Sequence, residues 1–192
     1  MANVTIFGDG NMGTVIADVL TAGGASVDHI TTADNGSGSV TGDLVVLAVP
    51  YAALEQIVRE YGDQLAGKTV VDITNPVNMQ TFDSRAVPAD SSAAAELAAA
   101  LPSAKVLKAF NTTFAATLAS RKVGPNPATV LIAGDDADAK AQLAAAVTAG
   151  GLEAVDAGSL RRAAELEALG FLQITLAASE KVGWTGGFGL VR

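Results

Sequence analysis

Three glycines near the N-terminus have the spacing of a phosphate-binding turn. Gly8, Gly10 and Gly13 form a G-x-G-x-x-G pattern between the strand-forming stretch 4–7 and a run with apolar residues at helical spacing. The first glycine permits the sharp bend, the second leaves room for a pyrophosphate, and the third lets the helix pack against the strand. The N-terminus of the helix offers unpaired N–H groups to the phosphates. The pattern predicts a dinucleotide site rather than an ordinary glycine-rich turn, and its other members are Asp9, Asn11 and Met12.

Two threonines occupy the place that distinguishes NAD from NADP. In an NAD-preferring fold, an aspartate or glutamate about 20 residues beyond the glycines binds the ribose 2′-hydroxyl. Here the place holds Thr31 and Thr32, whose hydroxyls can hydrogen-bond a 2′-phosphate that a carboxylate would repel. The sequence therefore favours NADP, although no arginine follows and Asp34 lies close by. The alternative is that both threonines merely end a strand.

Side chains suited to acid–base or metal chemistry are scarce. The chain has one histidine and no cysteine. These counts exclude a cysteine nucleophile, a multi-histidine metal site and a thiolate metal site. The single His29 falls within an expected strand, so we expect it to have a structural role. Lys108 is the one candidate for moving a proton, but an ordinary charge near a strand end is the simpler interpretation. We predict no metal site.

The net charge and the distribution of apolar residues limit which kinds of partner the protein could bind. The 192-residue chain has a formal net charge of −8, which argues against nucleic acid or an anionic membrane as its main partner. No apolar run reaches the ~18–20 residues of a membrane span without a charge or turn residue. The first strand is expected almost directly after Met1, so we expect no signal segment. We expect a cytoplasmic protein.

Alternating strands and helices must position the glycine turn and the residues after it. Strands are expected at 4–7, 26–30, 43–49, 69–73, 105–110, 128–133 and 152–156. Helices are expected at 11–22, from 51 onward, and at 93–100, 137–149 and 160–180. This order predicts an α/β protein with a Rossmann-type, doubly wound parallel sheet and a C-terminal helical extension. We expect residues 1–157 to form the dinucleotide-binding domain, and residues 158–192 to complete the cleft as a helix and tail.

Polar residues and prolines follow several of these strands. In a doubly wound sheet, ligands bind at the carboxyl ends of the strands, where this chain places Pro50, then 74–76, then Asn111. The Asn111 side chain can hydrogen-bond a carboxamide or a ring carbonyl, and a turn-making role is equally open. The irregular segment 77–92 is long for a compact domain, so we expect it to form one wall of the cleft.

Several segments, spread over nearly the whole chain, together resemble a known family. They are the glycine motif and the stretches 48–50, 72–76, 108–112, 158–161 and 189–192. This combination resembles the NADPH-dependent reductases of the deazaflavin coenzyme F-420, a family that includes related dinucleotide-binding flavin and ferric reductases. The chain departs from the family at 31–32, where a serine–arginine pair is common, and in a short crossover at 35–42.

The resemblance implies a role for each matching position. Residues 8–13 would hold the pyrophosphate, and Thr31 and Thr32 would face the 2′-phosphate. The nicotinamide ribose and ring would be lined by Ala48, Val49, Pro50, Thr74, Asn75 and Pro76. The second cofactor would be framed by Phe110, Asn111, the 77–92 loop and the C-terminal tail.

Hydride transfer between two stacked rings depends on close approach and exclusion of water more than on acid–base groups. We therefore predict an NADP-dependent oxidoreductase that exchanges a hydride between NADP(H) and F-420 or a flavin, FMN or FAD, with Asn111 as the candidate catalytic residue. One alternative is an NAD(P)-dependent reductase of a small imine or carbonyl substrate. Another is a dinucleotide-binding sensor without turnover. A basic cleft beside the nicotinamide would favour F-420 as the second cofactor. A small closed pocket would favour an imine or carbonyl substrate, and a blocked nicotinamide face would favour the sensor.

The last expected helix is apolar over more than one face. Its apolar residues are Leu166, Leu169, Phe171, Leu172, Ile174, Leu176 and Ala177. A surface helix normally keeps one apolar stripe and one polar face. We therefore expect a partner copy to cover this helix in a two-fold homodimer.

Overall fold

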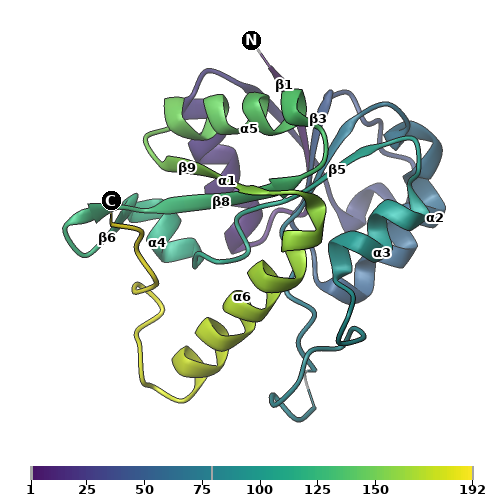
Figure 1. Cartoon of the computed structure of the whole chain (residues 1–192). Helices are drawn as coiled ribbons and strands as arrows, with labels where there is room; N and C mark the ends of the chain where they lie inside the picture. The colour runs from purple at the N-terminus through teal and green to yellow at the C-terminus, as the bar shows by residue number, and fades with distance from the viewer. Residues whose placement is uncertain (1, 79, 192) are drawn as a thin grey trace.

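The computed structural model describes residues 2–78 and 80–191 of the chain (Figure 1). Met1, Met79 and Arg192 lie outside the described residues; Met79 belongs to the expected cleft loop, and Arg192 ends the last segment that carries the family resemblance. The strands are β1 (Asn3–Phe7), β2 (Ser26–Ile30), β3 (Leu44–Leu47), β4 (Thr69–Asp72), β5 (Lys105–Lys108), β6 (Lys122–Val123), β7 (Asn126–Pro127), β8 (Thr129–Gly134) and β9 (Glu153–Gly158). The helices are α1 (Asn11–Ala22), α2 (Leu54–Leu65), α3 (Ala93–Ala100), α4 (Ala115–Ser120), α5 (Ala137–Ala149) and α6 (Ala163–Ala178), with 3-10 turns η1 (Thr32–Asp34), η2 (Tyr51–Ala53) and η3 (Leu160–Arg162).

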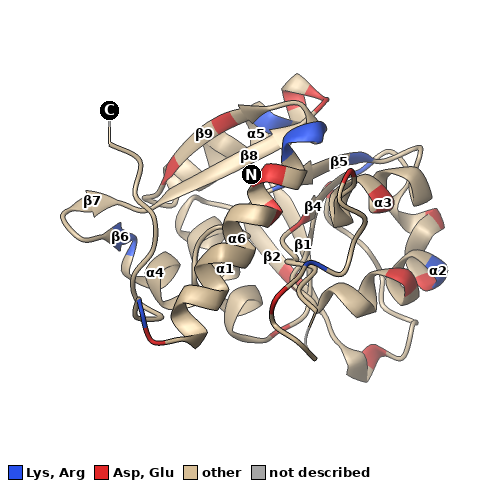
Figure 2. Cartoon of the chain, turned by 60° about the horizontal axis from the view of Figure 1, so that its bottom comes forward, with Lys and Arg blue, Asp and Glu red and all other residues tan. Residues whose placement is uncertain are grey.

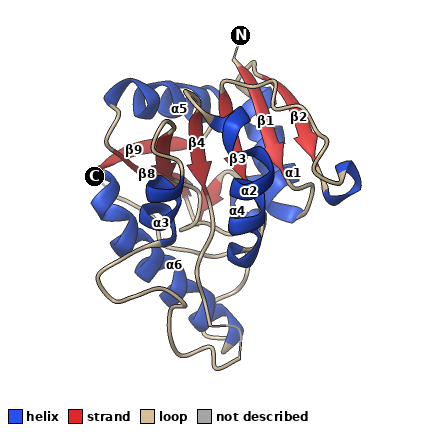
Figure 3. Ribbon diagram, turned by 90° about the vertical axis from the view of Figure 1, so that its right-hand side faces the viewer, coloured by secondary structure: helices blue, strands red, loops and turns tan. Residues whose placement is uncertain are grey.

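One seven-stranded sheet, in the order β2-β1-β3-β4-β5-β8-β9, forms the centre of the fold. Its central strands β3 and β4 are buried at every position, as strands covered on both faces must be. One core cluster joins the sheet to α1, α4 and α5, and a second joins it to α2 and α3. Figure 3 shows helices on both sides of the strands. The expected doubly wound α/β architecture is confirmed.

The expectation that every strand is parallel is wrong at one place in the sheet. Strand β8 pairs antiparallel with β5, in a register that joins Lys108 to Ala133, whereas β9 pairs parallel with β8. The connection 109–128 contains only the short α4 and the β6-β7 hairpin, without the long crossover helix that normally returns the chain for a parallel strand. The next strand therefore begins at the carboxyl end of β5 and runs in the opposite direction.

Helix α6 leaves the sheet at the edge where the central strands end (Figure 1). It begins after η3 and ends at Ala178, two residues before the expected end. Its buried residues lie on one face and are Ala163, Leu166, Glu167, Gly170, Gln173 and Ala177. The tail then returns toward α4, where the Thr117 hydroxyl donates to the carbonyl of Gly186 at 2.7 Å. Within the described part of the chain, no helix has the length and apolar character needed to cross a membrane.

Candidate functional site

The glycine turn has the geometry of a pyrophosphate cradle. Gly8 has φ +97°, and a Cβ there would overlap the carbonyl oxygen of Ala48; a Cβ on Gly13 would overlap the carbonyl oxygen of Gly8. A Cβ on Gly10 would meet no protein atom within 4 Å, so this glycine leaves space for a ligand rather than for packing. Helix α1 begins immediately after Gly10, with no side-chain cap and no acidic residue in its first turn. Its first N–H groups therefore face that space.

A cavity of about 510 Å³ lies beside this turn. It lies over the ends of β1, β2 and β3. The sequence-predicted residues that line it are Gly8, Asp9, Gly10, Thr31, Thr32, Ala48, Val49 and Pro50. The structure thus brings together, in one cavity, the residues assigned to the pyrophosphate, the 2′-phosphate and part of the nicotinamide ribose.

The carboxylate of Asp34, just after the end of β2, hydrogen-bonds Thr31 and so affects how the two threonines could bind a ligand. The amide of Thr31 donates to Asp34 Oδ2 at 2.7 Å, and the Thr31 hydroxyl donates to the same oxygen at 3.2 Å. The Thr31 hydroxyl is therefore already engaged, whereas Thr32 is exposed. The Thr-x-x-Asp spacing of a capping box is the sequence signal for this contact. Earlier in β2, His29 Nδ1 lies 3.0 Å from the carbonyl oxygen of Gly8, which gives His29 the expected structural role.

A second cavity, of 450 Å³, lies on the other side of the glycine turn. The start of α1, the segments after β4 and β5, the start of α4, helix α6 and the tail all contribute to its wall. The predicted site residues in this wall are Asn11, Met12, Asn75, Phe110 and Asn111. Thr74 and Pro76, also predicted, are buried in the segment that carries Asn75. In the same wall, the rings of Phe114 and Trp184 have centroids 4.9 Å apart.

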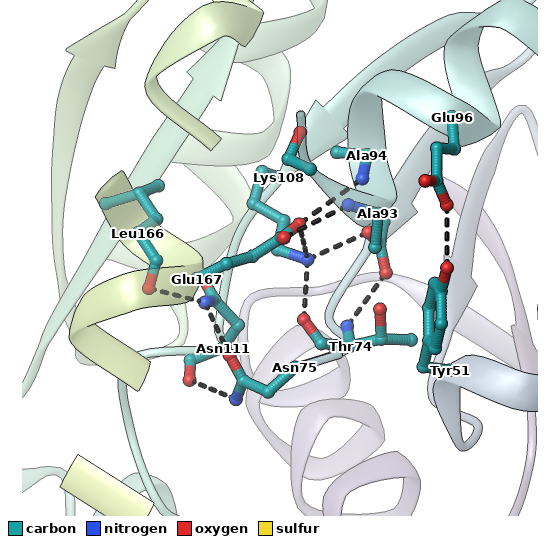
Figure 4. A network of polar contacts seen from close by, with 12 residues as sticks. Tyr51, Thr74, Asn75, Ala93, Ala94, Glu96, Lys108, Asn111, Leu166 and Glu167 are labelled. Atoms are coloured by element: carbon teal, nitrogen blue, oxygen red, sulfur yellow. Dashed lines mark hydrogen bonds and ion pairs between the residues drawn. The ribbon is translucent and has the colours of Figure 1, made fainter. Parts of the chain in front are cut away.

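Two asparagines fasten the ends of β4 and β5 to α6 (Figure 4). Asn111 Nδ2 donates to Asn75 Oδ1 at 3.0 Å and to the carbonyl of Leu166 at 2.9 Å, and Asn75 Nδ2 donates to the carbonyl of Asn111 at 2.8 Å. The buried Asn111 Oδ1 has no partner among the described residues, so it can accept a hydrogen bond from a ligand. A Cβ on Gly170 would overlap Asn75 Oδ1. Gly170 therefore permits the close approach of α6. It was not among the predicted site residues, although a glycine inside an otherwise apolar helix could have indicated a close contact.

A buried network of charges stands behind this wall (Figure 4). The Lys108 side chain is fully buried, and its Nζ lies 2.8 Å from both Asp72 Oδ2 and Glu167 Oε1. Glu167 also accepts hydrogen bonds from the amides of Ala93 and Ala94, at 3.0 and 3.3 Å, at the start of α3. Burial raises the pKa of Glu167, against the opposing effect of the Lys108 ammonium. The network ties α6 to β4, β5 and α3.

Lys108 therefore has neither of the roles considered from the sequence. It is not an ordinary charge at an accessible strand end, because its side chain has 0% exposure. Its ammonium is engaged by two carboxylates, so it is a structural group rather than a proton donor in the cleft. Asp72, which pairs with Lys108, and Glu167 were not predicted as partners, because they come from distant segments of the chain.

Tyr51 and Glu96 form a separate contact between η2 and α3. The Tyr51 hydroxyl donates to Glu96 Oε2 at 2.7 Å. Burial, followed by the hydrogen bond to Glu96, raises the pKa of Tyr51 to about 12, so the phenol keeps its proton at neutral pH. Ser92 caps α3 by accepting from the amide of Ala95 at 3.0 Å. Glu96 thus holds the Tyr51 side chain against α3.

Comparison with known proteins shows which reductases this chain resembles. The model of the family described as "NADP oxidoreductase coenzyme F420-dependent" matches residues 25–76. The F420-dependent NADP reductase of Methanocaldococcus jannaschii is 29% identical over 173 residues, which cover 88% of this chain and 77% of that protein. The chain is thus similar in sequence to this reductase over most of its length.

Two further relatives show how far the likeness extends. The structure of a protein assigned as an F420-dependent NADP reductase from Arthrobacter sp. FB24 covers 100% of both chains with a TM-score of 0.83 at 23% identity, which shows a shared fold. Metalloreductase STEAP3 of Rattus norvegicus is 38% identical over 109 residues. Those residues are 56% of this chain, but the match spans only 21% of the length of the rat protein.

The lining of the second cavity limits the chemistry that this cavity can support. Its described lining residues are apolar or neutral, and none of them is a histidine, lysine, tyrosine, aspartate or glutamate. Among the described residues, no group of three or more histidine, cysteine, aspartate or glutamate side chains could hold a metal ion. The arrangement can therefore position rings and exclude water, but its described wall offers no group for general acid–base chemistry.

Proposed function

We propose that the chain transfers a hydride between NADP(H) and a second ring cofactor, with the deazaflavin F-420 as first candidate and a flavin as second. The observation that carries the proposal is the pair of cavities that both border the glycine motif at 8–13. The first is lined by residues of the phosphate turn and the β2 end, and the second by Asn75, Asn111 and α6. When bound, a dihydronicotinamide supplies the hydride, and the second ring accepts it.

The residues of the chain fit a dinucleotide along this path. The space beside Gly10 and the uncapped start of α1 suit the pyrophosphate. The free Asn111 Oδ1 is placed to accept a hydrogen bond from the nicotinamide carboxamide. Phe114 and Trp184 supply apolar surface in the cavity wall that excludes water from the transfer. These residues act by orientation, which is the main requirement of hydride transfer between rings.

The described wall of the second cavity also helps to distinguish hydride transfer to a ring cofactor from reduction of an imine or carbonyl. Reduction of an imine or carbonyl requires a proton as well as a hydride, and no described lining residue is an obvious donor. Helices α1, α4 and α6 contain no lysine or arginine (Figure 2), so the basic cleft expected for F-420 is not formed by these helices. The anionic tail of F-420 would extend outside this cavity, and only the ring would occupy it.

The proposal is tested by following NADPH oxidation with F-420, FMN, FAD, ferric chelates and a small cyclic imine in parallel. We expect F-420 to be reduced fastest, flavins more slowly, and the imine not at all. Fast reduction of the imine would support the alternative reductase. Tight NADPH binding without turnover of any acceptor would favour the sensor. Titrations of NADPH and NADH in the same series test the preference for NADP.

We also propose that two copies pair through α6 and the tail, the unit that spans residues 158–192. After folding, α6 still leaves Leu172 50% exposed, and the tail leaves Trp184 54% and Phe188 46% exposed. Covering these side chains would remove apolar surface from water. Light scattering at micromolar concentration should report twice the chain mass, and Leu172→Glu should shift the protein toward the monomer. A wild-type monomer with full reductase activity would contradict the dimer.

A further inference from the structure

We propose that Gln173 selects the second ring by hydrogen-bonding an imide edge, a ring N–H beside a ring carbonyl. The inference deepens the proposed function and rests on it. Gln173 lies in α6, in the wall of the second cavity. It lies outside the stretches that carry the family resemblance. Its role is recognition of the ring, not participation in the hydride transfer.

The Gln173 side chain is buried without a hydrogen-bond partner. It is 2% exposed, and neither its Nε2 nor its Oε1 has a partner among the described residues. Folding has therefore removed this amide from water without replacing the lost hydrogen bonds, which is unfavourable. The C-terminal tail lies against it, since a Cβ on Gly187 would be 3.3 Å from Nε2, yet the tail does not bond it. A ligand in the cavity can supply both missing partners.

The chemistry of the amide indicates the class of ligand. A primary amide presents a donor and an acceptor side by side, so it matches a ring edge that presents an acceptor and a donor in the same way. The pyrimidinedione ring of deazaflavins and flavins has such an edge. The described lining contains no charged side chain, which favours a neutral heterocycle over a phosphate or carboxylate. Ile174, Phe114 and Trp184 provide apolar surface for the rest of the ring system.

The position of Gln173 separates it from the nicotinamide. Gly170, one helical turn earlier, already packs against Asn75, and three residues correspond to about 4.5 Å along a helix. Gln173 therefore lies farther along α6 than the asparagine pair. The free Asn111 Oδ1 remains available for the carboxamide of the dinucleotide, and Gln173 is left for the second ring.

The test uses the full chain loaded with NADP⁺, so that binding is measured without turnover. Lumiflavin and 3-methyl-lumiflavin are the probes, because the methyl group removes the imide donor and changes little else. In fluorescence titrations, the wild type should bind lumiflavin about tenfold more tightly than 3-methyl-lumiflavin. This is the factor expected for one hydrogen bond. Gln173→Leu should lose this preference. The control Gln142→Leu makes the same change at an exposed position of α5 and should keep it.

Stability gives an independent readout for the same residue. Because the buried amide is unpaired, Gln173→Leu should raise the Tm of the ligand-free protein or leave it unchanged. Gln173→Met preserves length and flexibility, and it replaces Gln173→Leu in the titrations if the leucine variant does not fold. A clear fall in Tm for both variants would identify Gln173 as a structural residue and overturn the proposal.

The remaining outcomes separate this inference from the proposed function. If the wild type reduces F-420 or FMN but Gln173→Leu keeps the preference for lumiflavin, the inference fails and the function stands. If Gln173→Leu weakens NADPH binding as strongly as lumiflavin binding, Gln173 recognises the nicotinamide, and the inference is again overturned. If the wild type shows the preference but transfers no hydride, the recognition stands and the proposed function fails.

Discussion

The two cavities of the cleft are built in different ways. The cavity at the dinucleotide end depends on one continuous stretch, residues 4–13, in which backbone groups and missing Cβ atoms form the binding surface. The second cavity depends on side chains from distant segments, which Asn75, Asn111 and the Lys108 network hold together. A backbone site can be recognised from the spacing of its glycines, whereas a site assembled from distant side chains requires the fold.

Because of this difference, we expect the second cavity to be sensitive to substitutions at residues that do not contact a ligand. The largest effect on stability is expected in the buried network around Lys108. Lys108→Met leaves the carboxylates of Asp72 and Glu167 buried without their cation. We expect a loss of about 3–5 kcal/mol in the free energy of unfolding, measured by urea denaturation. Lys105→Met, in the same strand, removes only a partly exposed pair and should change stability little. Equal stabilities of the two variants would contradict the account.

A substitution at the dinucleotide end should remove binding without unfolding the chain. Gly10→Val places a side chain where no protein atom lies within 4 Å, so it fills the space left for the pyrophosphate. We expect NADPH affinity to fall by at least about 100-fold in calorimetric titration, which corresponds to roughly 2.7 kcal/mol. Gly62→Ala in α2, where the nearest contact of a Cβ is Leu101 at 3.8 Å, is the control. Wild-type affinity in Gly10→Val would show that the glycines form only a turn.

At the second cavity, one methyl group should be enough to disturb the wall. Gly170→Ala places a Cβ against Asn75 Oδ1 and the carbonyl of Asn111, which forces α6 away from the strand ends. We expect a stability loss of about 1–3 kcal/mol, with acceptor turnover reduced more than NADPH affinity. Gly183→Ala in the tail, whose Cβ would approach only Thr185, at 3.7 Å, serves as the matched control. Unchanged turnover in Gly170→Ala would separate the asparagine pair from the transfer site.

The smallest expected effect concerns cofactor preference at the dinucleotide end. Asp34 places its carboxylate at the end of β2, bonded to Thr31, where it would repel a 2′-phosphate. Asp34→Asn should therefore raise the preference for NADPH over NADH by about tenfold, or roughly 1.4 kcal/mol. Asp138→Asn, in the first turn of α5, should leave the ratio of the two affinities unchanged. No change in Asp34→Asn would place the 2′-phosphate away from this carboxylate.

Features that depend on local sequence were predicted correctly, whereas features that depend on contacts between distant segments were not. Helices α1 and α3 have the predicted bounds, because glycines, Ser92 and apolar spacing define them locally. The parallel direction predicted for β8 was wrong, because the direction depends on how the connection 109–128 folds rather than on the pattern within the strand. The pairings of Glu167 and the isolation of Gln173 were also missed, since each depends on contacts between α6 and distant segments.

We propose that the two cavities hold two rings close enough for direct hydride transfer. The most direct test uses NADPH labelled with deuterium at one of the two C4 positions of its nicotinamide, with F-420 as acceptor in ordinary water. Mass spectrometry of the reduced deazaflavin then reports the origin of the new hydrogen, because a hydrogen on ring carbon C5 does not exchange with solvent. We expect deuterium in the product from one labelled isomer and not from the other. Reduction without deuterium from either isomer would contradict direct transfer.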